Sequence, residues 1–226
     1  SVPYHESFES YSDGYTMQAT NGWVSDIATA ATVSTNPSAI AALQSYAAPC
    51  GFPIKGEHNK VVMIDGIAAN HIAGPVATRT WYDQMVQVFP GQYDPSIAAE
   101  GHAGIYWNTV NHPVIWNRDL PAGTNRWAEI SDVTVAEGDW ARITLELSYD
   151  TTDEVWGARY YRVWIDGTGI SSSHAYTSSD GSGSAGGTWF PMPVGAAPTH
   201  ISSSLLVANG APSDDIVVTT SNPLSP

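Results

Sequence analysis

Positively charged side chains are scarce in this sequence, which has eight Lys and Arg residues against 22 Asp and Glu and a formal net charge of −14. Nucleic acids and anionic membranes attract proteins that present clusters of basic side chains. The charge balance therefore argues against both as partners. Neutral ligands and cations remain, and an anionic polymer would need a local group of arginines to overcome the field of the whole protein.

Cysteine and long apolar runs are also lacking. Cys50 is the only cysteine, so an intrachain disulfide and a zinc site built from several thiolates are excluded. No run approaches the ~18–20 apolar residues of a membrane-spanning helix. We therefore predict no membrane insertion. The seven histidines contain no His-x-His pair and no two at helical spacing, which argues against a transition-metal site.

Charged residues are only 13% of the chain, whereas hydrophobic residues reach 42%. An ordinary domain is about one quarter charged, so the polar surface must consist largely of Ser, Thr, Asn and Gly, as in many extracellular β-sandwiches. The first residue is Ser, no signal-peptide apolar region is present, and the chain ends in the Pro- and Ser-containing segment TSNPLSP. We expect one domain at 1–220, a linker starting at 221–226, and a secreted or cell-surface module of a larger exported protein.

Alternation of apolar and polar residues dominates the chain and predicts β-strands. The clearest strands are 79–89, 140–148, 159–165 and 214–220, and weaker ones are expected at 6–10, 60–64, 103–108, 112–116, 127–133, 168–175 and 200–207. Ten or more strands imply two stacked sheets. The fold class is therefore all-β, a two-sheet antiparallel β-sandwich with at most one short helix.

Two kinds of local signal mark turns and the helix. Asp65-Gly66 and Asp166-Gly167 each follow an apolar strand, and both pairs suit a two-residue hairpin whose central residues have positive φ. Asn36 followed by Pro37 is a typical helix start, and apolar residues then recur at helical spacing as far as Tyr46. We expect a short helix here.

Residue parity predicts which face of each strand is buried. In 140–148 the apolar residues share one face, and Arg142, Thr144, Glu146 and Ser148 share the other, which we expect to point outward. By the same parity, Tyr160, Arg162 and Trp164 point outward from 159–165. In 79–89 the outward set is Trp81, Asp83, Met85 and Gln87. A face that carries Trp, Asp and Gln is unusual for a surface that meets only solvent.

Four segments together resemble a known family. They are 6–26, 58–66 (HNKVVMIDG), 81–90 (WYDQMVQVFP) and 213–223 (SDDIVVTTSNP). The order of their motifs resembles the laminin-G-like, concanavalin A-like jelly-roll modules of large exported bacterial proteins. The resemblance covers nearly the whole chain and implies two curved antiparallel sheets, with a sugar-binding groove on the concave face. This superfamily includes lectin-like modules, glycosidases and polysaccharide lyases, so the fold alone does not choose among them.

The resemblance also implies a structural calcium ion where the first and last strands meet. The matching positions are Glu9 beside Phe8, and Asp214 and Asp215 before Ile216. Hard cations favour carboxylate oxygens, and three acids brought together would repel one another without a positive charge between them. The alternative is that these are exposed charges that protect a sheet edge against aggregation.

No recognisable catalytic set is present. The segment 137–142 comes nearest to the glycosidase pattern Glu-x-Asp-x-x-Glu of the family, but it has Arg142 where the acid/base should be, and two placed carboxylates are required. A lyase set of His102, Tyr106, Arg162 and Gln87 is possible, although no spacing selects these residues. A Gly-x-Ser-x-Gly nucleophile motif is also missing.

Nine Trp and eleven Tyr exceed what a core of this size needs, and exposed aromatic rings can stack on sugars. We therefore predict a non-catalytic carbohydrate-binding or adhesion module that recognises a polysaccharide or oligosaccharide. In this hypothesis Trp81, Tyr106 and Trp164 stack on the sugar, while Asp83, Gln87 and Arg162 bind its polar groups. A polysaccharide lyase or another carbohydrate-active enzyme using the same groove, and a structural spacer without a ligand, remain as alternatives.

Overall fold

The computed structural model describes residues 3–25, 29, 31–46, 58–73, 77–91, 102–120, 123–150, 159–176, 186–193 and 200–224. The strands of the first half are β1 (Tyr4–Glu6), β2 (Trp23–Ser25), β3 (Ala31–Ser34), β4 (Val61–Ala73), β5 (Arg79–Gln87), β6 (Ile105–Trp107) and β7 (Pro113–Asp119). Those of the second half are β8 (Thr124–Glu129), β9 (Trp140–Ser148), β10 (Tyr160–Ile165), β11 (Thr168–Gly169), β12 (Phe190–Pro191) and β13 (His200–Thr219), and the helix is α1 (Pro37–Ser45).

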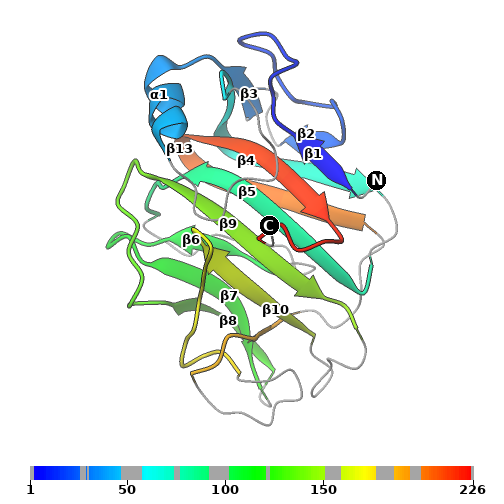
Figure 1. Cartoon of the computed structure of the whole chain (residues 1–226), viewed down its shortest axis with the longest axis vertical. Coiled ribbons are helices and arrows are strands. Elements are labelled where there is room, and N and C mark those ends of the chain that lie inside the picture. The colour runs from blue at the N-terminus through cyan, green and yellow to red at the C-terminus, as the bar shows by residue number, and fades with distance from the viewer. Residues whose placement is uncertain are drawn as a thin grey trace.

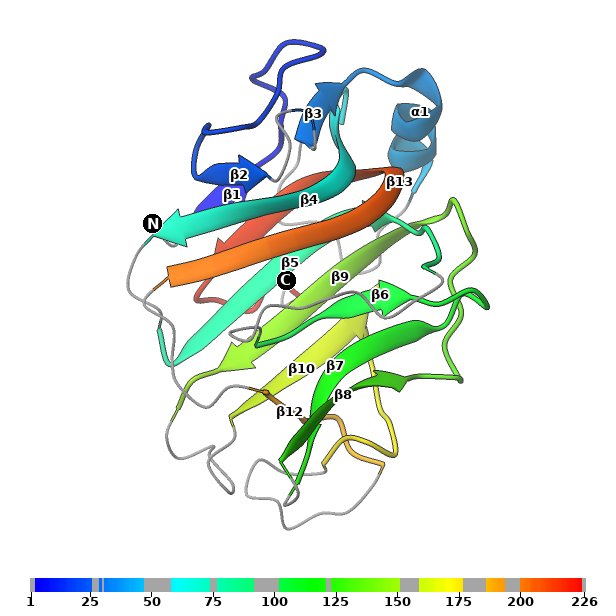
Figure 2. The same ribbon diagram turned by 180° about the vertical axis from the view of Figure 1, so that it is seen from behind.

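Two antiparallel sheets form the domain, which confirms the predicted β-sandwich. The large sheet has ten strands, with the main order β11-β10-β9-β5-β13-β4-β2, and the small sheet has the order β6-β7-β8. Figure 1 shows the strands of the large sheet side by side, with α1 at one edge. From behind, β6, β7 and β8 lie as a second layer beside β9 and β10 (Figure 2). The described part of the chain has no helix with the length and hydropathy to span a membrane.

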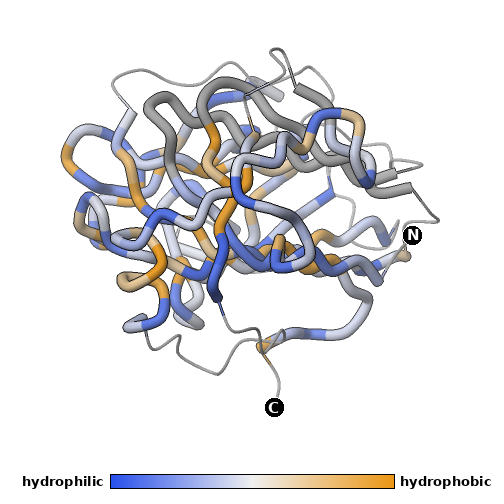
Figure 3. The backbone as a smooth tube through the Cα atoms, turned by 90° about the horizontal axis from the view of Figure 1, so that it is seen from above, coloured by the Kyte–Doolittle hydropathy of each residue, from blue (hydrophilic) through white to orange (hydrophobic). Residues whose placement is uncertain are grey.

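A shared apolar core joins the two layers. It contains Ile143, Tyr161 and Val163 from the large sheet together with Trp107 and Ile115 from the small sheet. These positions belong to the inward parities of their strands, so the predicted inner faces of β9 and β10 are confirmed. Figure 3 shows hydrophobic residues interspersed with hydrophilic ones along the chain, as expected for strands with two different faces.

The predicted strands at 140–148 and 159–165 correspond to β9 and β10 almost residue for residue. The hairpin at Asp166-Gly167 is also confirmed, because these residues have φ values of 52° and 75° and connect β10 to β11. The hairpin predicted at Asp65-Gly66 is wrong, since β4 continues through both residues and pairs with β13 beyond them. A strand partner supplied by the far end of the chain outweighs this local turn signal.

The helix begins where the sequence predicts. The Asn36 side-chain oxygen accepts hydrogen bonds from the backbone N–H groups of Ser38 (3.0 Å) and Ala39 (3.3 Å), and Pro37 occupies the first turn. Ala39 and Leu43 of α1 pack against Met85 and Trp140 of the large sheet. The helix therefore covers one end of the outer face of this sheet, which is the face turned away from β6, β7 and β8.

Because α1 and the chain end lie on the outer face, the expectation that the outward-parity residues face solvent is wrong. Parity separates the two faces correctly, but most of the outer-face residues are not exposed to solvent. Arg142, Thr144 and Ser148 have no exposed surface, and Tyr160 is equally buried. The physical reason is that α1, the chain end and neighbouring side chains lie over positions that an isolated strand would present to water.

Candidate functional site

Three residues in register on neighbouring strands form the centre of the first candidate site. Glu146 of β9 pairs with Trp81 of β5 on one side and with Arg162 of β10 on the other. Paired residues in an antiparallel sheet point to the same face, so all three lie on the outer face. Glu146 is only 3% exposed, and its carboxylate accepts a hydrogen bond from Arg79 and a longer, 3.5 Å contact from Arg162.

Aromatic rings surround this charged group. The Arg162 guanidinium lies 4.7 Å from the ring centre of Trp164 and 5.1 Å from that of Trp189. Trp164 in turn packs against Trp81, with ring centres 5.3 Å apart. Cation–π contacts of this kind hold an arginine in place without using its hydrogen-bond donors. We call Arg79, Trp81, Glu146, Arg162, Trp164 and Trp189 the outer-face cluster.

The members of the cluster differ in exposure. Trp81 is 7% exposed, so it supports the neighbouring ring more than it offers a surface of its own. Arg162 keeps 34% of its side chain exposed and Arg79 keeps 46%, while Trp164 and Trp189 are half-buried. A Cβ atom placed on Gly169 would lie 3.3 Å from the Trp164 indole nitrogen. The glycine therefore allows the Trp164 ring to lie across β11.

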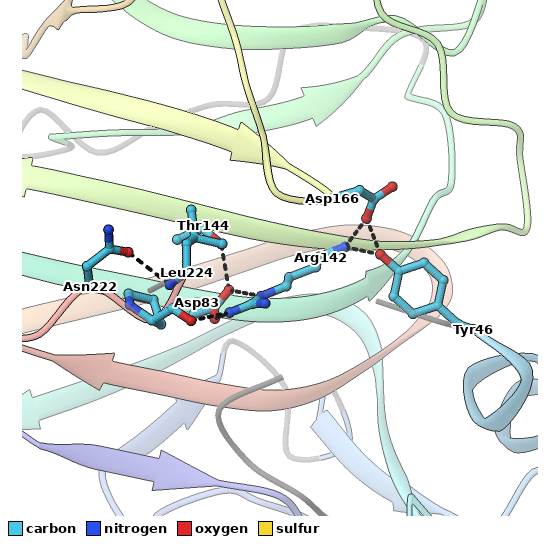
Figure 4. A network of polar contacts seen from close by, with 8 residues as sticks. Tyr46, Asp83, Arg142, Thr144, Asp166, Asn222 and Leu224 are labelled. Atoms are coloured by element: carbon cyan, nitrogen blue, oxygen red, sulfur yellow. Dashed lines mark hydrogen bonds and ion pairs between the residues drawn. The ribbon is translucent and has the colours of Figure 1, made fainter. Parts of the chain in front are cut away.

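Asp83 lies beside this cluster but is fully buried. Its carboxylate accepts hydrogen bonds from Nε and Nη2 of Arg142 at 3.0 and 2.6 Å, and from the Thr144 hydroxyl at 2.8 Å. Arg142 also donates to the Pro223 carbonyl, so the chain end crosses the sheet here (Figures 1 and 4). In this structure Asp83 orients Arg142, which holds the chain end on the outer face, and Asp83 does not form part of the surface.

Beyond the chain end, a groove of about 450 Å³ opens beside α1. Its lining includes Tyr46, Asp139, Trp140 and Asp166. The Asp166 carboxylate accepts hydrogen bonds from the Tyr46 hydroxyl and from the Arg142 backbone N–H (Figure 4). Burial, followed by the Asp166 hydrogen bond, raises the pKa of Tyr46 well above its usual value. This tyrosine is therefore a neutral hydrogen-bonding group.

The remaining predicted sugar ligands lie elsewhere. Gln87 is at the far end of β5, where its amide donates to the Gly138 carbonyl at 2.6 Å. Tyr106 belongs to the small sheet and packs edge-on against Trp127, with ring centres 5.1 Å apart. The structure thus brings Trp81, Asp83, Arg162 and Trp164 together on one face and places Tyr106 in the other layer.

The residues of the possible lyase set do not share one contact group among the described residues. Tyr106 and Arg162 belong to different sheets, and His102 instead contacts the hydroxyl of Tyr149 through Nδ1 at 3.2 Å. Tyr149 is part of the apolar core between the sheets. Burial and the nearby Arg159 lower the pKa of His102, while burial raises the pKa of Tyr149. This pair lies apart from the outer-face cluster.

The second candidate site lies where the two ends of the chain meet. β1 pairs with β13, with Glu6 opposite Ile216. Just before this pairing, the register of β13 against β5 shifts between Asp214 and Val217, which is the signature of a β-bulge. Asp215 has a φ of 46° within the bulge. Successive side chains of a regular strand point to opposite faces, whereas this bulge turns Asp214 and Asp215 toward one point.

His58 joins the two aspartates. Its Nδ1 lies 2.9 Å from Oδ2 of Asp214 and 3.3 Å from Oδ2 of Asp215. One ligand atom from each of the three residues can be chosen so that all lie within 4.8 Å of one another. Both aspartates are fully buried, and one oxygen of Asp214 and both of Asp215 have no hydrogen-bond partner. Uncompensated carboxylate oxygens are costly to bury, so this site, which we call the cation cluster, fits a divalent cation.

Glu9, the third predicted metal ligand, has a different place. Its Oε1 accepts hydrogen bonds from the backbone N–H groups of Asn59 (2.7 Å) and Lys60 (3.0 Å). Lys60 Nζ in turn donates to the backbone carbonyls of Glu9 and Tyr11, each at 2.6 Å. Glu9 therefore fixes the segment that presents His58, and it lies close enough to raise the pKa values of both aspartates.

The electrostatics of the cation cluster follow from burial. Desolvation, partly offset by the hydrogen bond from His58, raises the pKa of Asp214 to about 6. Desolvation and repulsion from Asp214 raise the pKa of Asp215 to about 8. The hydrogen bond to Asp214 raises the pKa of His58. The cluster therefore holds protons more tightly than isolated side chains do, as expected where negative charge lacks a counter-ion.

Sequence reasoning missed four of the contributing residues, and one of them, Arg79, stands at the start of the predicted strand 79–89. His58 stands just before the predicted strand at 60–64, and this position beside a candidate acidic site was the available signal. Glu146 was expected on an outward face but not as the partner of two arginines. Trp189 follows the low-complexity stretch 179–187, and nothing in its local pattern indicates the contact with Arg162.

No family model matches the sequence, and no curated protein is significantly similar to it. Several solved structures are similar to this chain. Domain 4 of an extracellular arabinanase from Geobacillus stearothermophilus, in complex with arabinotriose, is 13% identical, with a TM-score of 0.40 and coverage of 73% of this chain and 72% of that one. The calreticulin globular domain of T. cruzi is 16% identical, with a TM-score of 0.44 and coverage of 98% and 89%.

A doubly substituted alginate lyase in complex with an alginate tetrasaccharide is also similar. It is 10% identical, with a TM-score of 0.47 and coverage of 98% of this chain and 99% of that one. At these identities and TM-scores, the function of this chain has to be derived from its own side chains.

Proposed function

We propose that this domain is a non-catalytic carbohydrate-binding module that binds its ligand on the outer face of the large sheet. The observation that carries the proposal is the outer-face cluster, in which Arg162 lies between the half-buried rings of Trp164 and Trp189. Aromatic faces bind the C–H surfaces of sugars, and neighbouring donors bind the hydroxyl or acid groups. Rigid packing of Trp164 on Trp81 prepares the ring for binding, which reduces the entropy lost on association.

The charge of the cluster favours a sugar that carries a carboxylate. In the ion pairs seen among the described residues, Arg79 and Arg162 both contact Glu146, so two positive side chains meet one carboxylate there, although the whole chain has a net charge of −14. Such a local excess of positive charge can overcome an opposing overall field at short range, where salt screens distant charges. Arginine also binds carboxylates through two parallel hydrogen bonds. Polyuronates are thus the first ligands to test, and neutral oligosaccharides serve for comparison.

The absence of enzymatic activity is part of the proposal. Elimination requires a base within hydrogen-bond reach of the abstracted proton, with a charge neutraliser beside the same sugar. Among the described residues, the outer-face cluster contains arginines but no histidine, and the tyrosine that packs edge-on against Trp189, Tyr160, is fully buried and cannot reach a sugar on the surface. The alternative of a polysaccharide lyase is favoured only by the contact between His102 and Tyr149, with Arg159 close to both.

Binding of immobilised and soluble glycans, measured with Trp164→Ala and its parent, tests the proposed surface. We expect the variant to melt cooperatively and to lose about tenfold or more in affinity, because truncating a central aromatic contact typically costs about 1.4 kcal/mol or more. Tyr106→Ala is the matched control, since it removes a partly exposed aromatic ring from the other layer. The control should keep the affinity of the parent.

The reverse pattern, with loss only in Tyr106→Ala, would assign binding to the small sheet and refute the proposed surface. Trp81→Ala serves a different purpose. Because Trp81 is buried, we expect its truncation to lower the free energy of unfolding by about 3–5 kcal/mol.

An absorbance assay for unsaturated uronate, run on the same glycans, should give no signal. Product formation that disappears in His102→Ala would establish the lyase alternative.

A divalent cation at the cation cluster is the second part of the proposal. The buried, unpartnered oxygens of Asp214 and Asp215 support it, and the family resemblance predicts calcium as the ion. Its role would be structural, because it would join the strand that ends the domain to the loop before β4. Secretion remains a prediction from composition, and a place within a larger exported protein remains a prediction from the family resemblance.

A further inference from the structure

We infer that His58 is a nitrogen ligand of the cation cluster, and that the cluster consequently selects a first-row transition ion such as Zn²⁺ over Ca²⁺. This inference rests on the cation half of the proposed function and is independent of sugar binding. Two observations support it, one on the histidine and one on the aspartates. The His58 Nδ1 atom faces both carboxylates at 2.9 and 3.3 Å, and three of the four buried carboxylate oxygens of Asp214 and Asp215 lack hydrogen-bond partners.

The backbone is arranged to bring these atoms together. Phe8, His58 and Asp215 all have positive φ, at 62°, 48° and 46°, a conformation that costs free energy for residues other than glycine. Phe8 stands next to Glu9, which fixes the segment after His58 through the N–H groups of Asn59 and Lys60. Strain of this kind persists only where surrounding contacts enforce it. In the cation cluster the result is a converging group of donor atoms.

The donor set distinguishes between cations. Ca²⁺ takes six to eight oxygen ligands at about 2.3–2.6 Å, whereas imidazole nitrogen suits Zn²⁺ and its first-row neighbours at about 2.0–2.1 Å. The donor set of the cation cluster, one imidazole nitrogen together with the carboxylate oxygens of two aspartates, therefore favours the first-row ion.

Metal binding would replace the hydrogen bond between these two residues. The neutral imidazole carries its proton on Nε2 and offers the Nδ1 lone pair to the metal, while the carboxylates of Asp214 and Asp215 supply oxygen ligands. Glu9 then acts as a positioning residue that holds the His58 segment. No covalent bond changes within the protein, and a proton released from the cluster passes to solvent.

Titration of chelator-treated protein with Zn²⁺ and Ca²⁺, followed by calorimetry and thermal melting, tests the inference. We expect Zn²⁺ to bind at least about tenfold more tightly than Ca²⁺. Co²⁺ should give visible absorption bands typical of mixed nitrogen and oxygen ligation, which report on the ligand directly. Asp214→Asn should weaken binding of every ion, and His5→Ala should not, because His5 is an exposed histidine on β1.

Two variants of His58 make the result specific. His58→Asn tolerates positive φ and places an amide oxygen near the former Nδ1 position, so Zn²⁺ affinity should fall about tenfold or more while Ca²⁺ affinity is kept. His58→Ala should weaken Zn²⁺ binding and abolish the imidazole-dependent Co²⁺ spectrum. Preferential Ca²⁺ binding that neither variant alters would overturn the nitrogen ligand but keep the cation site. Absence of binding by all three ions would overturn both.

Discussion

Asp215→Asn is expected to stabilise the metal-free domain, although it removes a fully buried native side chain. Both carboxylate oxygens of Asp215 lack hydrogen-bond partners, and burial together with Asp214 raises its pKa from 3.8 to about 8. At pH 7 Asp215 is ionised in the unfolded chain, where its pKa is 3.8, but protonated in the folded protein. Folding must therefore take up a proton at a pH that lies 3.2 units above the pKa of the unfolded side chain. At about 1.36 kcal/mol for each pH unit, this costs about 4 kcal/mol.

Asparagine removes that cost and introduces an amide that needs partners of its own, so we expect a net gain of about 2 kcal/mol. In a domain of this length the gain corresponds to a rise in melting temperature of roughly 4–8 °C. Asparagine also tolerates the φ of 46° at this position. The free energy of unfolding, measured in denaturant with a chelator at pH 7, gives the result directly. Asp132→Asn, at an exposed position, is the matched control and should change little.

The sign must reverse when a divalent cation is present. A bound ion stabilises the folded state by mass action, and Asp215→Asn removes one of its charged ligands. The parent should therefore gain more stability from the ion than the variant does. If Asp215→Asn instead destabilised the chelator-treated protein, Asp215 would have to be satisfied by hydrogen bonds. The reasoning from a missing counter-ion would then be refuted.

Three further outcomes follow from the same structure. Without metal, the free energy of unfolding should fall as pH rises from about 5 to about 8, because the raised pKa values of Asp214, Asp215 and His58 favour protonation of the folded state. Denaturant unfolding measured at several pH values in this range checks the sign. With added cation, the free energy of unfolding should instead rise with pH. Arg142→Met should cost about 3–5 kcal/mol, because it leaves the Asp83 carboxylate buried without its partner, and Asp83→Leu/Arg142→Met should recover most of the loss in denaturant unfolding. Asn36→Ala should cost about 1 kcal/mol through loss of the helix cap, and an unchanged unfolding midpoint would show that α1 does not depend on its cap.

Local patterns in the sequence were sufficient for much of the fold. Alternation in 140–148 and 159–165 predicted β9 and β10, because a strand with one apolar face leaves a two-residue period. The cap at Asn36 and the turn at Asp166-Gly167 were equally predictable, since each depends on the conformational preferences of one or two residues. Pairing of the first strand with the last was expected from the family resemblance and is present as β1 with β13.

The candidate sites required tertiary structure, because long-range pairing decides which side chains meet. Trp81, Glu146 and Arg162 lie far apart in the chain and come into one row only through the registers of β5, β9 and β10. Parity placed Asp83 on the outer face but gave no sign that Arg142 and the chain end would bury it.

The cation cluster was likewise predicted only in part from the sequence, and the tertiary structure supplied the rest. Sequence resemblance selected Asp214 and Asp215, whereas only the bulge in β13 turns both carboxylates toward His58, at the start of a distant strand. A local sequence pattern indicates only the conformation of its own segment. The meeting of segments depends on packing free energy distributed over the whole domain, and for that reason it cannot be obtained from any single segment.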